Sequence, residues 1–442
     1  MKRIAIGSRA RGSRRRLGSG RLFACAVSSW LLAGTSGADP APEEESEDAA
    51  DLVGTCCHLV RYLDGVPRVL IRGPSCDCPG VGFGFNLMYL NRVTAEDYPA
   101  ETREDAGYNW KTTVPCLLHR PNGELWLQTG WNAHSYVPEE RGKTWVSAYV
   151  SGSRILLTVV DDLPCHELQA ADGAKAYFHA SGGLEGKIHK LVSRSGRSWH
   201  FFYYGSGDGR YAYKLRSVYL PDTLRFWQFY YNADTGFLRE IRVVRGARVE
   251  GSIRLSYYDA LWEGIGSPED LKEVVVATRD EGSDDWKERR IFLRYYTERS
   301  ERGRKHDLKF LIGPENCEKL SRLAGKRYLE NVPDAEIRSE DPKDPFARYD
   351  AYFEYDDVKG DGELDGRTRT IELQNLSPEI PDATAQDLGT HSYAWEILNG
   401  PGSWIRAPYS QEILDVRVTR PDGKTLVLRV NRGGFVVSAR YE

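Results

Sequence analysis

The sequence predicts an all-β fold built from repeated antiparallel β-hairpins, with one short helix inserted among them. The 442 residues include 25 Tyr, 11 Trp and 43 Gly but only 2 Met. Aromatic side chains favour strands, and glycine favours tight turns. A strand motif that ends in an aromatic pair also recurs along the chain. With 40% hydrophobic residues, the chain is long enough to bury one large core or two ordinary ones.

The N-terminus has the features of an export signal. Eight basic residues and no acidic ones lie among the first 21 positions, and the apolar run Leu22–Ala33 follows. Ser36 and Ala38 fit the small residues of a signal-peptidase site, which predicts cleavage before Asp39. The basic run 13–17 leaves the general and the twin-arginine export routes both open. We expect a secreted, periplasmic or cell-surface protein, and the apolar run is too short to span a bilayer.

Residues 1–38 are therefore interpreted as a signal peptide, and their removal makes the chain more acidic. The 60 Lys and Arg residues fall to 52 while the 64 Asp and Glu residues remain, so the formal charge changes from −4 to −12. Nucleic acid is excluded as a partner on this basis, which leaves other proteins or cell-surface glycans. The acidic tract Glu43–Asp48 has nothing to bury, so residues 39–55 are expected to form an acidic flexible linker.

Seven cysteines remain after the signal peptide, and they raise the question of disulfides. Exported proteins fold where thiols oxidise, so we expect six to pair and one to be left over. A zinc site fits less well, because structural zinc sites use spacers of two to four residues and the first four cysteines are not spaced in this way. The seven are Cys56, Cys57, Cys76, Cys78, Cys116, Cys165 and Cys317.

The repeat is clearest where aromatic pairs end a strand. Tyr204, Tyr231 and Tyr258 close three such strands at a spacing of 27 residues. Each pair is followed by a polar turn and a strand that begins with leucine, so the unit is a β-hairpin. The strand-leading leucines are Leu215, Leu238, Leu271 and Leu308, and further copies of the motif end at Tyr296, Tyr355 and Tyr441.

The remaining elements are placed around this array. Short alternating runs between turn signals predict a β region over 56–195 that precedes the repeats, which occupy 196–357. Within the repeats, residues 314–324 have proline at the start, leucines three apart and a following glycine, which predicts the inserted helix. Residues 358–390, rich in Asp, Gly, Glu and Pro, are expected to form a polar loop, and 391–442 the C-terminal β-strands.

These residues resemble the YD-repeat family, which includes bacterial Rhs proteins and the shell region of teneurins. The family unit has the form Gly-Arg-Leu, then Tyr-x-Tyr-Asp and Gly, and the matching stretches here are Leu224–Val243 and Arg197–Val218. The resemblance covers roughly residues 58–357 and depends on recurrence, since no single motif in it is specific.

The resemblance implies a sheet that spirals into a hollow, YD-shell-like partial shell or barrel, with each hairpin covering the edge of the last. It further implies tyrosines stacked in cross-strand ladders with their hydroxyls facing water. The array departs from the family pattern in two ways. It is short for a full shell, and Asp follows Tyr only at Asp259 and Asp356. We therefore do not carry over an enclosed passenger domain, nor the family's self-cleavage, whose sequence element we do not find.

No set of residues has the spacing of a known catalytic, cofactor or metal site, and we assign none. His189 and His200 flank a turn near Glu185 but are interpreted as ordinary strand residues. The segment 357–366 resembles a calcium loop, yet Lys359 stands at the third ligand position and Thr368 at the twelfth, where an EF-hand requires Asp or Asn and Glu. We expect a solvated loop there.

Three further groups of residues are candidates for catalysis or ligand binding, but each has an ordinary structural explanation. The pairs Asp161-Asp162 and Asp284-Asp285 lie beside turns, where Asp supports local backbone bonding. The glycine-rich run 205–210 lacks the Lys-Ser/Thr of a phosphate loop and is interpreted as a hairpin tip. Exposed tryptophans stack on sugars, but core packing is the favoured interpretation for Trp126, Trp131 and Trp145.

Taken together, these features predict an exported, non-enzymatic YD-repeat-like protein with a structural or binding role at the cell surface or outside the cell. Its expected contacts are with other proteins or glycans. The alternative is a polysaccharide-acting enzyme that uses carboxylates in a β-groove, which only the acidic and aromatic content suggests.

Overall fold

The computed structural model describes most of the chain beyond the predicted signal peptide and linker, which lie outside the described residues. The described ranges are 59–61, 65–76, 83–90, 105–129, 132–139, 143–147, 152–261, 264–279, 285–323, 329–338, 348–356, 366–381, 383–398, 411–431 and 436–442. Antiparallel β-sheet dominates them, so the predicted all-β class is confirmed. Among these residues, no helix is both long and apolar enough to cross a membrane.

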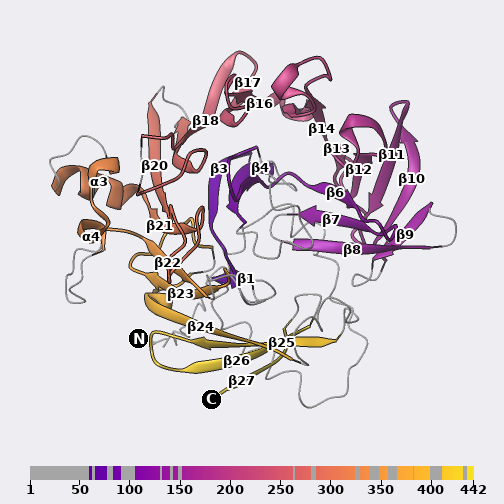
Figure 1. Ribbon diagram of the computed structural model, residues 1–442. Coiled ribbons are helices and arrows are strands. Elements are labelled where there is room, and N and C mark those ends of the chain that lie inside the picture. The colour runs from indigo at the N-terminus through magenta and orange to yellow at the C-terminus, as the bar shows by residue number, and fades with distance from the viewer. Residues whose placement is uncertain are drawn as a thin grey trace, which may run out of the picture.

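One main sheet of 22 strands runs from β6 to β27, and each strand pairs antiparallel with the next in the chain (Figure 1). It curves around the molecule (Figure 1). Its first part consists of β6 (Cys116–His119), β7 (Leu125–Thr129), β8 (Asn132–Pro138), β9 (Thr144–Ser147), β10 (Arg154–Val160), β11 (Leu163–Gln169), β12 (Lys175–His179) and β13 (Ile188–Val192).

The second part of the sheet contains the predicted repeats, and we call it the tyrosine wall. It consists of β14 (Ser198–Tyr203), β15 (Leu215–Leu220), β16 (Arg225–Tyr231), β17 (Leu238–Arg245), β18 (Arg248–Tyr257), β19 (Leu271–Arg279), β20 (Trp286–Tyr295), β21 (Leu308–Ile312), β22 (Ala351–Tyr355) and β23 (Thr368–Leu373). The sheet ends with β24 (Gly389–Ile397), β25 (Glu412–Thr419), β26 (Thr425–Asn431) and β27 (Val436–Tyr441).

Every hairpin of the tyrosine wall is closed by the same tyrosine hydrogen bond. A β-bulge precedes the last tyrosine of β14, β16, β18, β20 and β22. The hydroxyl of that tyrosine donates to the carbonyl of the first residue of the preceding strand, at 2.6–2.8 Å. The five donor and acceptor pairs are Tyr203 with Ile188, Tyr231 with Leu215, Tyr257 with Leu238, Tyr295 with Leu271 and Tyr355 with Leu308.

The position of the closing tyrosine corrects the predicted alignment of the repeats. Tyr231 is the second tyrosine of its pair, whereas its structural equivalents Tyr203 and Tyr257 are the first of theirs. The 27-residue spacing of Tyr204, Tyr231 and Tyr258 therefore joins positions that are not equivalent. The strand-leading leucines are confirmed, since β15, β17, β19 and β21 each begin at one.

The second tyrosine of a pair connects one repeat to the next. Tyr204, Tyr258 and Tyr296 donate to carbonyls two strands further on, and each stands edge-on to the closing tyrosine of the next hairpin. The implied cross-strand ladder is thus present. The implied water-facing hydroxyls are wrong for these residues, because each hydroxyl donates to a backbone carbonyl within the protein.

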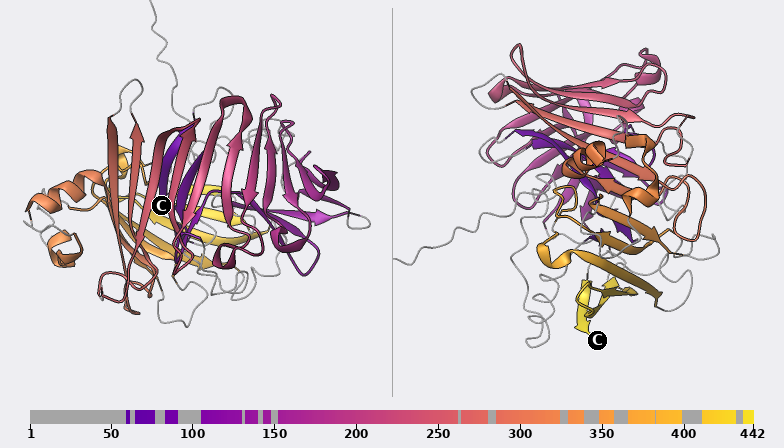
Figure 2. Two further views of the ribbon diagram at one scale, coloured as in Figure 1. Left: turned by 90° about the horizontal axis from the view of Figure 1, so that it is seen from above. Right: turned by 90° about the vertical axis from the view of Figure 1, so that its left-hand side faces the viewer.

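The hollow of the sheet holds a second, smaller sheet, which we call the plug: β3 (Leu70–Cys76), β4 (Phe83–Tyr89) and β5 (Trp110–Thr112). Figure 1 shows β3 and β4 within the curve of the main sheet, and Figure 2 shows them against the strands of the wall. Phe85 stands edge-on to Phe229 at 4.7 Å between ring centroids. The Trp110 indole nitrogen donates to the Tyr295 hydroxyl at 2.8 Å.

Close approach of the two sheets depends on a glycine. A Cβ on Gly73 of β3 would lie 2.3 Å from the Ile253 side chain of β18, so no larger residue fits there without movement. At the edge of the plug, Leu308 donates its backbone N–H to the Tyr89 hydroxyl at 2.8 Å. A short ladder of β1 (Val60–Arg61) with β2 (Val66–Pro67) precedes the plug in the chain.

The predicted helix is confirmed as α3 (Pro314–Leu323), and a second helix, α4 (Asp334–Ile337), was not predicted. Together with residues 329–333, they cover the outer face of β20, where Arg294 is fully buried. Its guanidinium donates to the carbonyls of Leu329 and Val332 and pairs with Asp334. The insertion is thus bonded to the wall through a buried arginine.

Two sequence expectations need correction here. The stretch 358–390 contains β23, because Ile371 and Leu373 alternate with polar residues and pack into the core, so it is not wholly a polar loop. Among the described cysteines, Cys165 and Cys317 are free thiols, so the expected pairing of six cysteines is not supported for these two. Cys56, Cys57 and Cys78 lie outside the described residues, as does the side chain of Cys76.

Candidate functional site: the arginine cluster around Glu354

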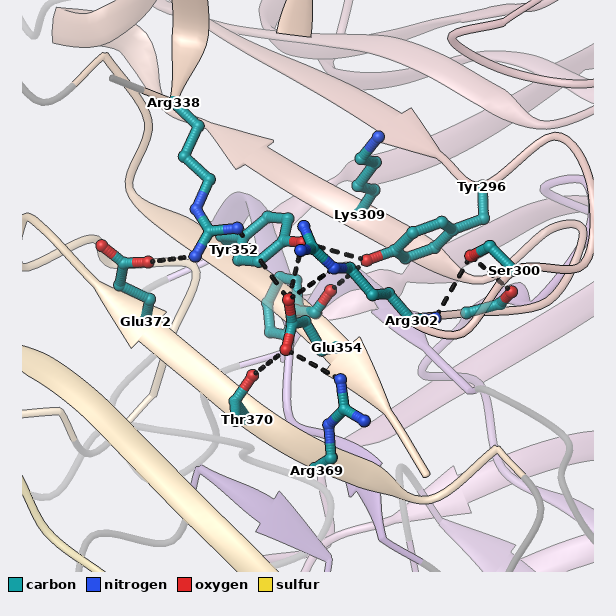
Figure 3. A network of polar contacts seen from close by, with 12 residues as sticks. Tyr296, Ser300, Arg302, Lys309, Arg338, Tyr352, Glu354, Arg369, Thr370 and Glu372 are labelled. Carbon is teal, nitrogen blue, oxygen red and sulfur yellow. Dashed lines mark hydrogen bonds and ion pairs between the residues drawn. The ribbon is translucent and has the colours of Figure 1, made fainter. Parts of the chain in front are cut away.

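Alternation along β22 directs Glu354 to the outer face of the wall. Its neighbours Phe353 and Tyr355 are fully buried in the core, and successive side chains of a strand point to opposite faces. Tyr352, two residues before Glu354, lies on the same face and donates its hydroxyl to the Glu354 carboxylate at 3.0 Å. Figure 3 shows this carboxylate at the centre of a polar network.

Three arginines from separate segments converge on Glu354, and we call them the arginine rim (Figure 3). Arg369 of β23 lies 3.1 Å from the carboxylate, Arg302 of the loop between β20 and β21 lies 3.5 Å away, and Arg338 beyond α4 lies 3.9 Å away. Thr370 donates its hydroxyl to the same carboxylate at 3.1 Å. The network thus joins the wall to the helical insertion.

Arg338 is held most firmly of the three. Its guanidinium lies 4.0 Å above the ring of Tyr352 and pairs with Glu372 of β23 at 3.3 Å. Stacking on an aromatic ring and pairing with a carboxylate are both favoured by the planar guanidinium. The side chain is therefore fixed in place before any ligand arrives.

The Glu354 carboxylate is much less exposed to solvent than the three arginines around it. The Glu354 side chain is 13% exposed, whereas Arg302 is 59%, Arg338 37% and Arg369 41% exposed. Burial raises the pKa of Glu354, but hydrogen bonds from Arg369, Tyr352 and Thr370 outweigh this effect and lower the pKa below its usual value. The carboxylate stays charged at the base of the cluster, and the guanidinium groups form its solvent-facing rim.

The rim has a surplus of positive charge and of donors. Three arginines face two glutamates, Glu354 and Glu372. Each guanidinium carries five N–H donors, more than the two carboxylates accept together. The arrangement is suited to binding a further anion, above all a carboxylate or phosphate that accepts two parallel hydrogen bonds.

Sequence patterns do not predict this cluster. Arg302, Arg338 and Arg369 lie 36 and 31 residues apart, in a loop, beyond a short helix and on a strand. The available clue was the alternation Tyr352-Phe353-Glu354-Tyr355, which places a carboxylate among aromatic residues on one strand.

The histidines weighed from the sequence do not form one site. His189 lies 3.1 Å from Asp161, whereas Glu185 lies 3.4 Å from His119 on another strand. A hydrogen bond from His189 lowers the pKa of Asp161, the opposite of what a catalytic acid requires. Among the described residues, no group of three or more His, Cys, Asp or Glu side chains has the geometry to hold a metal ion.

Asp161 and Asp162 have a structural place in the turn between β10 and β11. Their φ angles are +52° and +63°, in the left-handed region that Asp tolerates in turns. Asp284 lies outside the described residues, as does most of the segment 357–366. Thr368, the twelfth position of the calcium-loop comparison, lies just beyond this segment. It donates its hydroxyl to the Gly65 carbonyl at 2.6 Å, so it is not a free calcium ligand.

The carboxylate with the pKa most suited to a glycosidase acid is buried. Burial raises the pKa of Asp350 to about 6, but its side chain accepts from Asn316 and is 5% exposed. Glu379, which is fully buried, pairs with Arg289 and accepts from Ser377. In this structure neither carboxylate is accessible to a polysaccharide, so the groove expected for an enzyme gains no support here.

The tryptophans are likewise engaged within the protein. Trp145 belongs to the core and donates to the Gly123 carbonyl at 2.9 Å. Trp126 has Arg120 above its ring at 4.2 Å and donates to Glu124. Trp131 lies outside the described residues. The glycine-rich run 205–210 forms a hairpin tip in which Asp208 accepts from Gly205, as the sequence predicts.

No family model and no curated protein matches this sequence. Among solved structures, the chain is similar to the N-terminal domain of effector protein SpvB from Salmonella typhimurium strain LT2, at 10% identity over 52% of this chain and 93% of that one, with a TM-score of 0.25. It is also similar to TcdB2-TccC3 without its hypervariable C-terminal region, at 11% identity over 70% of this chain and 15% of that one, with a TM-score of 0.27.

A third similar structure is a porin-like protein from Bacteroides uniformis ATCC 8492, at 10% identity over 74% of this chain and 95% of that one, with a TM-score of 0.20. Scores of this size are too low to assign a family or an activity.

Proposed function

We propose that this protein is an exported, non-enzymatic, YD-shell-like scaffold that binds another protein through its outer surface. The observation that supports this proposal is the filled hollow. Phe85 and Trp110 of the plug occupy the concave side of the wall, against Phe229 and Tyr295. A side of the sheet that is covered in this way is not available to a passenger, which leaves the outer face for partners.

The arginine rim is the part of the outer face best suited to this role. Arginine is enriched among the residues that dominate protein interfaces, because its planar guanidinium forms two parallel hydrogen bonds with one carboxylate. The rim has a surplus of positive charge, and the buried ring of Tyr352 holds Arg338 in place beneath any ligand. We therefore assign it a carboxylate-bearing protein segment as its ligand, in preference to a glycan.

Titration of the full chain with poly-L-glutamate tests this assignment, with dextran as the neutral polysaccharide. We expect saturable binding of poly-L-glutamate in 50 mM salt and none of dextran. Arg302→Ala should weaken binding about tenfold, equal to about 1.4 kcal/mol, while two arginines still neutralise Glu354. Arg242→Ala is the matched control, since Arg242 also pairs with a glutamate and lies over a tyrosine ring on the wall.

Equal binding by the Arg302→Ala and Arg242→Ala variants would contradict the role of the rim. Turnover of dextran would instead favour the polysaccharide-acting alternative.

A further inference from the structure

The chain carries a concentrated set of carboxylates close to the point where it enters the described fold. The acidic tract Glu43–Asp48 contains five carboxylates in six residues. We propose that this tract docks on the arginine rim of its own chain. This inference rests on the proposed function, since it names a ligand for the same surface.

Charge and hydrogen-bond chemistry match between the two segments. The rim offers three partly exposed guanidinium groups against two carboxylates. Carboxylates accept paired N–H bonds from arginine in a fork geometry that ammonium groups cannot reproduce. The tract supplies the negative charge that the rim lacks.

The tether places the tract within reach of the rim. The Gly65 carbonyl, in the turn between β1 and β2, accepts from the backbone N–H of Thr368 at 3.0 Å and from its hydroxyl at 2.6 Å. Thr368 directly precedes Arg369, so the start of the fold is bonded to the strand that carries the rim. From Asp48 to Leu59 the chain spans eleven residues, about 36–40 Å when extended.

A tether of this length raises the effective concentration of the tract at the rim. Segments joined by short linkers meet at effective concentrations on the order of millimolar, so even a weak carboxylate contact is largely occupied. A protein partner must then displace the tract.

A competition experiment tests the docking on full chains, with a fluorescein-labelled peptide of residues 39–55 as the probe. One chain is unchanged, and in the other the tract is neutralised by E43Q, E44Q, E45Q, E47Q and D48N. Fluorescence anisotropy in 50 mM salt should give at least tenfold tighter peptide binding to the neutralised chain, where no tethered tract competes. This binding should fall at least tenfold on adding R302A, and stay unchanged on adding R242A.

Because removal of an arginine leaves Glu354 less compensated, R302K provides a second variant that keeps the charge and loses the fork. Peptide binding by R302K between that of the unchanged rim and R302A supports the docking. Equal peptide affinity of the unchanged and neutralised chains overturns it. If poly-L-glutamate binding still depends on Arg302 in that case, the docking alone fails; if that dependence is also lost, the proposed function fails with it.

Discussion

The tyrosine wall and the plug are both antiparallel β-structure, but contacts of different range hold them. The hydroxyl bonds that close the wall hairpins join residues 15 to 47 positions apart. The bonds that seat the plug join residues 185 and 219 positions apart, Trp110 with Tyr295 and Tyr89 with Leu308. The wall is thus specified by local repetition, whereas the plug depends on a wall that is already in register.

Removal of a plug anchor should have the largest effect on stability. Trp110 is fully buried, and Trp110→Ala should lower the free energy of unfolding by about 3–5 kcal/mol, because it leaves a cavity between plug and wall. Urea unfolding followed by circular dichroism measures the loss. Trp286→Ala on the wall is the control, since Trp286 is 43% exposed; equal losses in the two variants would show that the plug does not stabilise the wall.

Acid should lower the stability of the protein through two buried histidines on strands that precede the tyrosine wall. Burial lowers the pKa of His166 and of His179 to about 4, well below the 6.5 of a free histidine. Both histidines are neutral in the fold, so their contribution is complete above pH 6.5 and is lost as the pH falls towards 4.

The pH dependence can be followed by the urea midpoint between pH 7 and pH 4. It should fall over this range in the unchanged protein and fall less in the His166→Gln and His179→Gln double variant. A midpoint that changes equally in both proteins would assign the acid sensitivity to other groups.

The closing tyrosines allow a finer test, because one of them serves both regions. Tyr257→Phe removes a single hydrogen bond to a carbonyl, whereas Tyr295→Phe also leaves the Trp110 indole N–H without its acceptor. We expect losses of about 1 kcal/mol and about 2 kcal/mol respectively. A double-mutant cycle with Trp110→Phe should cancel the difference; additive losses would mean that Tyr295 does not couple plug and wall.

The smallest expected effect concerns a turn glycine of the wall. Gly236, two residues before Leu238, has a φ of +76°, and an added Cβ would meet only ordinary contacts at 3.6 Å or more. Gly236→Ala should therefore cost about 1 kcal/mol of backbone strain alone. Gly65→Ala should cost more, since its Cβ would lie 2.7 Å from that of Arg367. Thermal unfolding compares the two, and equal costs would contradict the close packing at Gly65.

Sequence patterns predicted the parts of this fold that repeat locally. Tyr-Tyr pairs, glycine turns and strand-leading leucines such as Leu238 recur within each hairpin, so composition and spacing were enough for the wall and for α3. They could not fix the phase of the repeat, because the closing tyrosine is the first of its pair at Tyr203 and Tyr257 but the second at Tyr231. Nor could they place the plug, whose partners on β16 and β20 are more than 100 residues away in the chain.

The candidate site was beyond sequence reasoning for the same physical reason. Arg302 and Arg338 are ordinary charged residues in their own segments, and they form a cluster only because the fold brings both to Glu354. The histidines and paired aspartates drew attention because they are neighbours in sequence. Glu185 pairs with His119 and His189 pairs with Asp161, which shows that closeness in sequence is weak evidence for a shared site.

Hydrogen exchange of the full chain tests the central claim, the filled hollow, most directly. Amides of β4 in the plug should exchange as slowly as those of β18 in the wall, because both open only on global unfolding. Exchange of β4 that is orders of magnitude faster, while β18 stays protected, would mean that the plug leaves the hollow without unfolding of the wall. That result would contradict a filled interior and restore the concave face as a binding surface.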